Sequence, residues 1–430
     1  MSLFALVGVA QAIPESESPF RNLGIFARVL AHIERSYVEE VDQDALIYGA
    51  IRGLMSTLDP HSLFMDPEEY RLLTSDTQGR FGGIGVEIHV QDGYLVVVGL
   101  VDDGPAQEAG MREGDRFLRI DGLGARDLQI AQAVRRVRGE PGSTVQVTIR
   151  REGHERDLEF NLTREVIKVE PIEASVIPDR VLYLKVKAFQ EGSTEQLRQA
   201  IDVALASTSQ DLSGVLLDLR NNPGGLLSEA ISMSDVFLSS GTIVSTRGRD
   251  GIPIDTVTAS QLDTAPPWPM VVLVNGYSAS AAEIVAGALQ DHGRAVLVGT
   301  RSFGKGSVQN IIELPGGSAM KLTVARYYTP SGQSIQAQGI EPDVRVEQFD
   351  TRELIDARRD VHPLIREESL EGHLDADASR RPELPARGQP RLVPESVPSE
   401  VFSSDFQARI AHQTLRGLQI HQQGRSDSSQ

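Results

Sequence analysis

Two segments rich in small residues carry side chains that could perform nucleophilic catalysis. In the first, an apolar stretch at 271–274 leads through Ser278 and Ser280 into a helix-like stretch that begins at Ala281. A serine at a strand-to-helix turn lies beside backbone N–H groups and the positive end of the helix dipole, which suits a nucleophile. The same position suits a serine that only caps the helix. Taken alone, Ser280 is therefore interpreted more simply as a cap.

The second segment places Lys305 between two glycines. Lysine is scarce, so this one does not belong to a generally charged surface; the lysines of the chain are Lys168, Lys185, Lys187, Lys305 and Lys321. Flanking glycines allow close backbone packing, and a lysine that loses its hydration there has a lowered pKa. A neutral lysine can take a proton from a serine hydroxyl. The alternative is a phosphate-binding Gly-Lys loop, although the segment lacks the full Walker spacing.

A third segment could supply backbone hydrogen-bond donors. The apolar stretch at 214–219 breaks at Asn222 and Pro223, and Gly224 and Gly225 then open a helix-like stretch. Glycines at a helix start leave backbone N–H groups pointing outward, as an oxyanion hole requires. Alone, a Pro-Gly-Gly sequence is also a common tight turn.

Together, the three segments resemble the carboxyl-terminal processing, or tail-specific, protease family of Ser-Lys peptidases, and the resemblance covers about residues 20–347. Lys305 follows Ser280 by 25 residues, as the base of that family follows its nucleophile. The resemblance implies a serine endopeptidase that works through an acyl-enzyme. It implies that Ser280 is the nucleophile, Lys305 the base and Gln309 the residue that orients the lysine. It also implies that the backbone N–H groups of Gly225 and Ala281 form the oxyanion hole.

The stretch at 81–165 resembles a PDZ domain, with a glycine-rich opening followed by short strands of period two and one helix near 128–138. In PDZ domains a glycine-rich loop presents successive N–H groups to the terminal carboxylate of a peptide, which adds a strand to the sheet edge. The candidate donors are Gly83, Ile84, Gly85 and Val86. Arg138 is a candidate regulatory residue that couples peptide docking to opening of the catalytic site. For the glycine-rich opening, the alternative is an ordinary β-hairpin. For Arg138, the alternative is a solvated surface arginine.

The pattern of apolar residues predicts the elements that hold these segments. Strands alternate with helices across 168–350, which is typical of an α/β layer fold, with strands at 181–186, 214–219, 270–274 and 295–298 and helices at 193–206, 227–237 and 281–290. The expected fold class is therefore α/β within an α+β multidomain chain, and the resemblance implies a crotonase-like peptidase core with an inserted PDZ domain. The remaining expected parts are a helical segment at 20–75, a linker at 76–80, a Pro-rich linker at 351–403, and a C-terminal helix at 404–430 whose tail after Gly424 is expected to be disordered.

Composition restricts the partners of the chain. The formal net charge of -18 disfavours nucleic acid and anionic membrane surfaces, and the absence of cysteine excludes a thiolate nucleophile. No motif implies a metal or a cofactor. Residues 1–12 resemble the end of a signal peptide, so we expect export in a bacterium, to the periplasm or otherwise, with membrane association left open and no membrane span in the mature chain. The expected partners are protein substrates with free, apolar C-termini, and the terminal helices could pair in a homodimer.

Three other functions remain open from the sequence. A Ser-His-Asp triad could use His61 or His292 as the base, although His292 suits a helix end. A PDZ scaffold with a degenerate catalytic domain would need no active serine. An acyl-CoA enzyme of the crotonase type would share the glycine-based oxyanion logic, but it would not account for the PDZ-like stretch or for Lys305.

Overall fold

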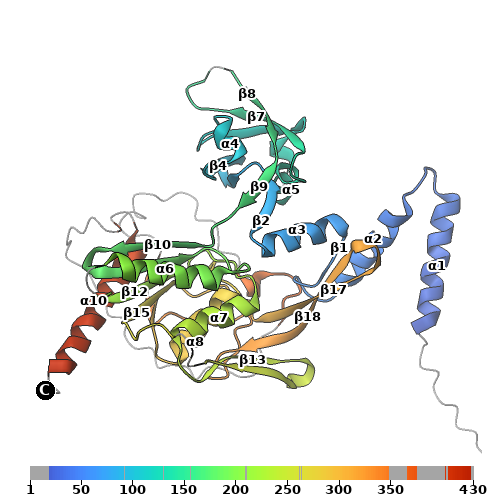
Figure 1. Cartoon of the computed structure of the whole chain (residues 1–430). Helices are drawn as coiled ribbons and strands as arrows, with labels where there is room; N and C mark the ends of the chain where they lie inside the picture. The colour runs from blue at the N-terminus through green and yellow to red at the C-terminus, as the bar shows by residue number, and fades with distance from the viewer. Residues whose placement is uncertain are drawn as a thin grey trace, which may run out of the picture.

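The computed structural model describes residues 19–347, 366–374, 402 and 405–427, except for 92, 129, 155, 209–210, 261 and 263. These residues form a helical N-terminal part, a β-rich domain and an α/β core (Figure 1). The signal-like residues 1–12 and most of the expected linker 351–403 lie outside the described residues.

The N-terminal part contains three helices and one short strand: α1 (Pro19–Ser36), α2 (Gln43–Met55), β1 (Leu63–Met65) and α3 (Pro67–Thr77). Acidic side chains start two of these helices. Asp42 accepts hydrogen bonds from the first N–H groups of α2, and Asp66 forms a reciprocal capping box with Glu69 at α3. Such caps satisfy N–H groups that have no partner within the helix. On α1, a set of apolar side chains remains exposed: Leu23, Ile25, Phe26 and Val29.

The β-rich domain is an antiparallel sheet in the order β3-β4-β5-β7-β8, with β6 paired to β5. Its elements are β3 (Val86–Gln91), β4 (Tyr94–Leu100), α4 (Pro105–Glu108), β5 (Arg116–Ile120), β6 (Leu123–Gly124), α5 (Ile130–Val137), β7 (Thr144–Arg150) and β8 (Leu158–Thr163). Strand β7 shows the alternation expected of a half-buried strand, because Val145, Val147 and Ile149 point into the domain core.

A two-stranded ribbon connects the β-rich domain to the rest of the chain. Strand β2 (Arg80–Gly83) leads into the domain and β9 (Glu165–Lys168) leads out of it. The two strands pair antiparallel, so that Arg80 lies opposite Lys168 (Figure 1). The domain is thus an insertion whose two ends lie side by side.

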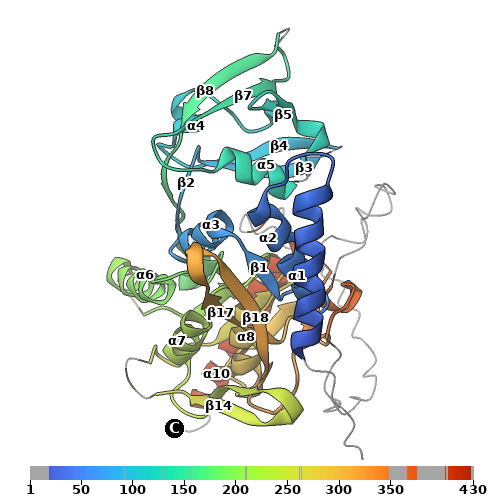
Figure 2. The ribbon, with the colours of Figure 1, turned by 90° about the vertical axis from the view of Figure 1, so that its right-hand side faces the viewer.

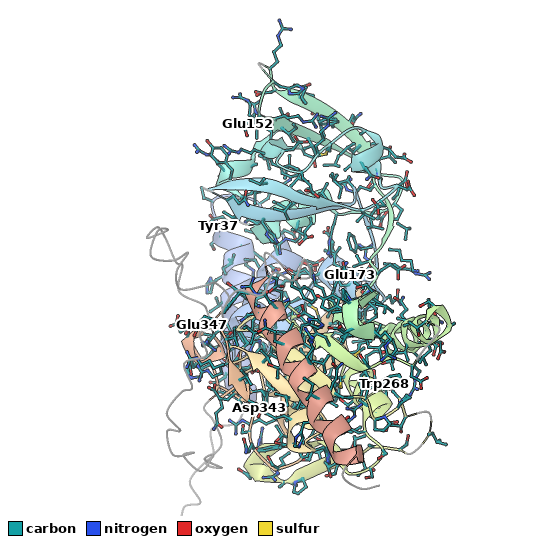
Figure 3. All side chains as sticks on the ribbon, turned by 90° about the vertical axis from the view of Figure 1, so that its left-hand side faces the viewer. Tyr37, Glu152, Glu173, Trp268, Asp343 and Glu347 are labelled. Atoms are coloured by element: carbon teal, nitrogen blue, oxygen red, sulfur yellow. The ribbon has the colours of Figure 1, made fainter. Side chains whose placement is uncertain are left out.

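The core contains a six-stranded sheet in the order β10-β11-β12-β15-β16-β19, parallel except for β10. Its strands are β10 (Ile172–Ile177), β11 (Val181–Val186), β12 (Gly214–Asp218), β15 (Met270–Val274), β16 (Val296–Gly299) and β19 (Val344–Arg345). Leu217 and Val272 face the helices α6 (Ser193–Ser207), α7 (Leu227–Phe237) and α8 (Ala281–Asp291). Their neighbours Leu216 and Val271 face α10 (Phe406–Asp427), which lies across the opposite face (Figure 3).

A second sheet brings the N-terminal part to the core. It has the order β1-β18-β13-β14, and β17 also pairs with β18. Its further strands are β13 (Thr242–Arg247), β14 (Pro253–Thr258), β17 (Ser307–Glu313) and β18 (Ala319–Tyr328). Leu63 of β1 lies opposite Lys321 of β18, so the turn before β1 is held beside this long strand (Figure 2).

The core elements agree with the strands and helices expected from the sequence to within a few residues. Helix α10 extends to Asp427, beyond Gly424, where a tail without structure was expected. A single glycine is not enough to end a helix, because it costs only about 1 kcal/mol relative to alanine. Short 3-10 turns complete the described structure: η1 (Ala125–Asp127), η2 (Pro178–Arg180), η3 (Arg249–Gly251), η4 (Pro315–Gly317) and η5 (Glu367–Ser369). Among the described helices, none is long and apolar enough to cross a membrane.

Candidate active site

Ser280 lies in the turn that leads from β15 to α8. The residue is 8% exposed, and its φ of 55° falls in the left-handed region that residues other than glycine seldom adopt. Strain of this kind often marks functional positions. Ser278 has a different, structural role, since its hydroxyl donates to the Leu219 carbonyl at 2.8 Å and accepts the Asn275 N–H at 2.9 Å. Thus Ser278 anchors the turn to the end of β12.

The carboxylate of Glu283 joins the two candidate catalytic segments. Its Oε2 atom accepts the N–H of Ser280 at 2.8 Å and the N–H of Lys305 at 2.9 Å. Its Oε1 atom accepts the N–H of Gly304 at 2.7 Å and the hydroxyl of Ser302 at 2.5 Å. Burial raises the pKa of Glu283 to about 7, and these donors oppose the rise. One buried side chain therefore sets the separation of the Ser280 and Lys305 backbones.

Lys305 lies in an environment that disfavours its charged form. Burial, together with the positive charge of Lys321, lowers the pKa of Lys305 to about 8. The carboxylates of Glu367, Glu283 and Asp59 partly oppose that shift. With this pKa, about a tenth of the amine is neutral at pH 7 and about half at pH 8, and the neutral form is the one that general-base chemistry requires.

The glycines around Lys305 are required by close backbone contacts. Gly304 has a φ of +99°, and a Cβ at Gly306 would lie 2.3 Å from the backbone nitrogen of Gln336. The segment leads into strand β17. A phosphate-binding loop leads into a helix whose N-terminus holds the phosphate, so that alternative does not fit.

Gln309 lies on β17, on the same segment as Lys305. Its Nε2 group donates to the Ser307 hydroxyl at 2.8 Å and lies 3.5 Å from the Thr323 hydroxyl. Because the amide nitrogen is bound in this way, the carbonyl oxygen Oε1 is the end left to accept a hydrogen bond from an amine.

The turn after β12 packs directly against Ser280. A Cβ at Gly224 would lie 2.8 Å from the Cβ of Ser280, and one at Gly225 would lie 2.1 Å from the Phe189 carbonyl oxygen. Only glycine fits both positions, whose φ values are +101° and +143°. Within the described part of the chain, the N–H groups of Gly225 and Ala281 donate no hydrogen bond. They are thus free to bind an oxyanion.

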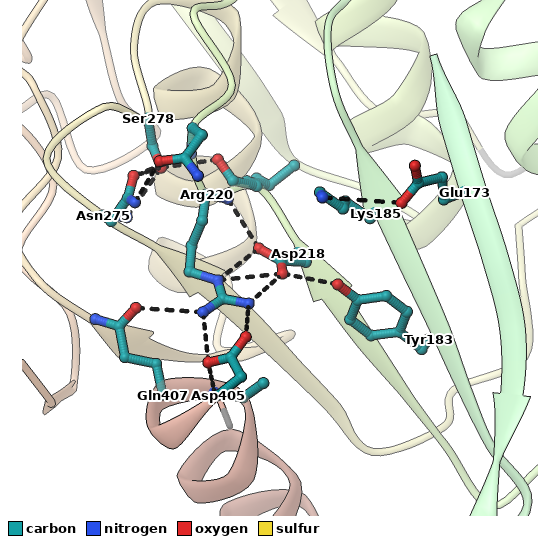
Figure 4. A network of polar contacts seen from close by, with 12 residues as sticks. Glu173, Tyr183, Lys185, Asp218, Arg220, Asn275, Ser278, Asp405 and Gln407 are labelled. Atoms are coloured by element: carbon teal, nitrogen blue, oxygen red, sulfur yellow. Dashed lines mark hydrogen bonds and ion pairs between the residues drawn. The ribbon is translucent and has the colours of Figure 1, made fainter. Parts of the chain in front are cut away.

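An ion-pair network holds the same turn against the C-terminal helix (Figure 4). Arg220 contacts Asp218 at 2.6 Å and Asp405, just before α10, at 2.7 Å. Tyr183 donates its hydroxyl to Asp218 at 2.9 Å. Burial lowers the pKa of Arg220, but the hydrogen bonds to the two carboxylates outweigh burial and raise it. This guanidinium is therefore a fixed cation that ties the end of β12 to α10.

Tyr327 of β18 lies beside the Ser280 side chain. Burial raises the pKa of Tyr327 to about 12, and a hydrogen-bonding interaction with Ser280 acts in the opposite direction. The phenol is thus protonated at neutral pH. Among the described residues, no hydrogen bond joins the Ser280 hydroxyl to the Lys305 amine. The structure brings the two backbones together, and the serine side chain rests against the tyrosine.

Among the described residues, no hydrogen bond joins Ser280 to either histidine considered as an alternative base. His292 follows the last residue of α8, whereas Ser280 precedes the first, so an 11-residue helix of about 16 Å separates them. The His292 ring contacts the Thr242 carbonyl at 2.7 Å. His61 is paired with the buried Glu367 at 2.7 Å.

The four candidate donors of the expected carboxylate-binding loop lie where β2 meets β3: Gly83 ends β2, Ile84 and Gly85 lie between the strands, and Val86 begins β3. The Ile84 carbonyl accepts the Ala106 N–H at 2.9 Å, and the Gly85 carbonyl accepts the Val101 N–H at 2.9 Å. These bonds hold the carbonyls inward. The N–H groups of Ile84 and Gly85 donate to no other residue that the structure describes, and both residues are buried.

Arg138 lies where the β-rich domain meets the N-terminal part. Its guanidinium pairs with Asp76 of α3 and stacks over the Phe81 ring at 4.0 Å. A second ion pair, from Arg71 to Glu140 at 3.1 Å, joins the same two parts. Arg138 is thus an inter-domain contact and not a solvated surface arginine.

The sequence reasoning missed several residues around the site. Glu283 was visible only as the third residue after Ser280, a spacing typical of a side chain that binds an N-terminal N–H. Tyr327 and Lys321, on β18, carry no local signal. Among the described residues, no group of three or more acidic, histidine or cysteine side chains could hold a metal ion.

Comparison with known proteins identifies related chains. The profile of peptidase family S41 matches residues 180–346, that of the PDZ domain matches 82–162, and that of the activating protease CtpB N-terminal domain matches 8–69. The carboxy-terminal-processing protease of Bartonella bacilliformis is 39% identical over 97% of this chain and 94% of its own length. The carboxyl-terminal-processing protease of Synechocystis is 38% identical over 70% of this chain and 71% of its own. A solved structure of a photosystem II D1 C-terminal processing protease is 28% identical, covers 75% of this chain and 92% of its own, and has a TM-score of 0.49.

Proposed function

Because this chain belongs to the carboxy-terminal processing protease family, serine-type peptidases of family S41 that carry a PDZ domain, we propose that it is an endopeptidase with a Ser280–Lys305–Gln309 mechanism. The observation that carries the proposal is the double hydrogen bond of Glu283 to the backbones of Ser280 and Lys305. The lowered pKa of Lys305 supports it.

In the proposed reaction, the neutral Lys305 amine takes the proton of the Ser280 hydroxyl as the serine oxygen attacks the scissile carbonyl. The N–H groups of Gly225 and Ala281 bind the oxyanion that forms. The lysine then gives its proton to the leaving amine, and an acyl-enzyme remains. The Lys305 amine next takes a proton from the water that attacks the ester, and it returns this proton to the Ser280 oxygen as the ester bond breaks, which releases the new C-terminus and restores the free enzyme. Gln309 accepts an N–H of the lysine amine, so that the nitrogen lone pair faces the serine.

The substrate is proposed to be a protein with a free, apolar C-terminus that the PDZ domain binds. The N–H groups of Ile84 and Gly85, which no described residue accepts, support carboxylate binding there, with Gly83 and Val86 flanking them. We further propose that Arg138 couples this binding to the catalytic domain. Its contact with Asp76 supports this role, because movement of the domain would break that ion pair.

Two further aspects of the proposal concern assembly and location. The exposed apolar side chains of α1, namely Leu23, Ile25, Phe26 and Val29, support pairing of two copies through their N-terminal helices. The signal-like sequence at 1–12 supports export, with the periplasm as the proposed compartment.

Cleavage of an unstructured protein with an apolar C-terminus tests the proposal. Ser280→Ala and Lys305→Ala should each abolish cleavage, and His292→Ala should not, since that ring contacts the Thr242 carbonyl at the far end of α8. Amidation of the substrate C-terminus should raise KM by removing the carboxylate that the loop binds. Full activity of Lys305→Ala would contradict the Ser-Lys mechanism. Tail binding without cleavage by the parent protein would favour a PDZ scaffold.

A further inference from the structure

The turn before β1 contains a buried carboxylate that the proposed mechanism does not use. Asp59 is 8% exposed and accepts the N–H groups of His61 at 2.9 Å and Ser62 at 3.0 Å. It also accepts the hydroxyls of Ser62 at 2.6 Å and Thr323 at 3.1 Å. Burial acts in the opposite direction, but these bonds, led by that of the Ser62 hydroxyl, lower the pKa of Asp59. The carboxylate is therefore ionised and can only accept hydrogen bonds.

Asp59 determines the direction of the next hydrogen bond through Thr323. A hydroxyl has one proton, and Thr323 donates it to Asp59. The Thr323 oxygen can consequently only accept from its cross-strand neighbour Gln309, whose Nε2 lies 3.5 Å away. The backbone of Thr323 is held as well, because its N–H donates to the Ser62 hydroxyl at 3.0 Å. The turn thus orients both the main chain and the hydroxyl of Thr323.

The direction of this bond matters because the two ends of a glutamine amide have the same shape and opposite hydrogen-bonding character. With Nε2 held by Thr323 and Ser307, the oxygen Oε1 of Gln309 is the end that can face an amine. An amine that donates to Oε1 keeps its lone pair for the serine proton. If the amide were flipped, its NH₂ group would compete with the serine for that lone pair.

We propose that Asp59 is a positioning residue for catalysis, which acts through the Thr323 hydroxyl to hold the Gln309 amide with its carbonyl oxygen toward Lys305. The proposal rests on the proposed catalytic role of Gln309. Asp59 and Thr323 lie 264 residues apart in the sequence. The N-terminal part therefore has a direct role in the geometry of the site in this proposal.

The negative charge of Asp59 also acts on the pKa of Lys305, separately from its positioning role. Three carboxylates raise the pKa of Lys305, those of Glu367, Glu283 and Asp59, whereas burial and Lys321 lower it. These groups come from η5, α8, the turn before β1, and β18. His61, in the same turn, faces Glu367 at 2.7 Å. Asp59→Asn, which keeps the shape of the side chain, should therefore move the acid limb of the pH–rate profile to lower pH.

A double-mutant cycle tests the positioning role. Loss of the hydroxyl in Thr323→Val should lower kcat about tenfold, the equivalent of one hydrogen bond, with KM within about twofold of the parent. Thr323→Ser keeps the hydroxyl and should restore kcat to within about threefold. In a Gln309→Ala background, Thr323→Val should change kcat by less than about twofold, because the residue through which it acts is gone. Thr256→Val, an exposed threonine on β14, is the matched control.

Each outcome decides a different point. An equal loss from Thr323→Val in both backgrounds would show a merely structural effect and overturn the proposal. Loss of kcat in Gln309→Ala together with parental kcat in Thr323→Val would overturn it and leave the Ser-Lys-Gln mechanism intact. Parental kcat in Gln309→Ala would refute the proposed role of that glutamine. Should Thr323→Val not fold, Asp59→Asn replaces it in the cycle, and an unmoved acid limb in that variant would contradict the effect of charge.

Discussion

Burial of the Lys305 side chain should destabilise the folded protein at neutral pH, and its pKa gives the size of that effect. The folded-state pKa is lowered from 10.5 to about 8. The unfolded chain therefore binds the proton more tightly, and protonation favours unfolding. A difference of about 2.5 units at about 1.4 kcal/mol per unit amounts to about 3 kcal/mol. Lys305→Met, which removes the charge and keeps the length, should accordingly be inactive and more stable by up to about 3 kcal/mol at pH 7.

The pH dependence of the stability gain in Lys305→Met shows whether the gain comes from removal of the charge or from better packing of the methionine side chain. Below about pH 8, both folded and unfolded states hold the proton, so the whole cost of Lys305 is present. The cost shrinks as the pH rises through the folded-state pKa and vanishes above the unfolded value of 10.5. If methionine instead stabilised the protein by better packing, the increase in the free energy of unfolding would be the same at every pH.

Urea unfolding of both proteins between pH 6 and pH 10.5 measures the difference. Lys168→Met is a suitable control, because that lysine side chain is 58% exposed and pairs with the exposed residue Glu170; it should change stability by less than about 0.5 kcal/mol. A Lys305→Met variant less stable than the parent by the same amount at pH 7 and pH 10 would refute the reasoning.

Three further substitutions test other parts of the site. Lys321→Met removes a positive charge that lowers the pKa of Lys305, so the acid limb of kcat/KM should move up by about one unit and the rate at pH 7 should fall more than at pH 9. Gly224→Ala would place a Cβ 2.8 Å from that of Ser280 and should lower kcat at least about a hundredfold; parental kcat would show that the turn can yield. Asp405→Ala leaves a buried guanidinium with one carboxylate and should cost about 1–3 kcal/mol in urea unfolding, whereas an unchanged midpoint would mean that α10 docks by its apolar face alone.

Local sequence patterns were sufficient to predict most of the core and to mark Ser280 and Lys305 as candidates, but only the family resemblance favoured Ser280 as a nucleophile over a helix cap. The strands of the parallel sheet are continuous apolar runs because both of their faces are buried, and the helices between them are of ordinary length. The chemistry of the two candidates depends on their immediate neighbours, small residues at the serine and glycines at the lysine. Such neighbours can be seen without knowledge of the fold.

The contacts that organise the site could not be predicted, because they join residues far apart in the chain. Asp59 contacts Thr323 across 264 residues, and His61 contacts Glu367 across 306. Residues 366–374 were expected to belong to a linker because their surroundings are polar and rich in proline. Glu367 is instead fully buried, because His61 and Gln336 pair with its carboxylate. A polar residue is readily mistaken for a linker residue when its partner is unknown.

The ribbon of β2 and β9 makes the PDZ domain a removable module. Arg80 and Lys168 lie opposite each other as an antiparallel pair, so the two cut ends left by excision would be only about 5 Å apart. A two-residue hairpin turn could rejoin them without disturbing either sheet of the core. Relatives could therefore lose, exchange or duplicate their substrate reader while the catalytic scaffold stays the same, and a chain engineered in this way would separate recognition from cleavage.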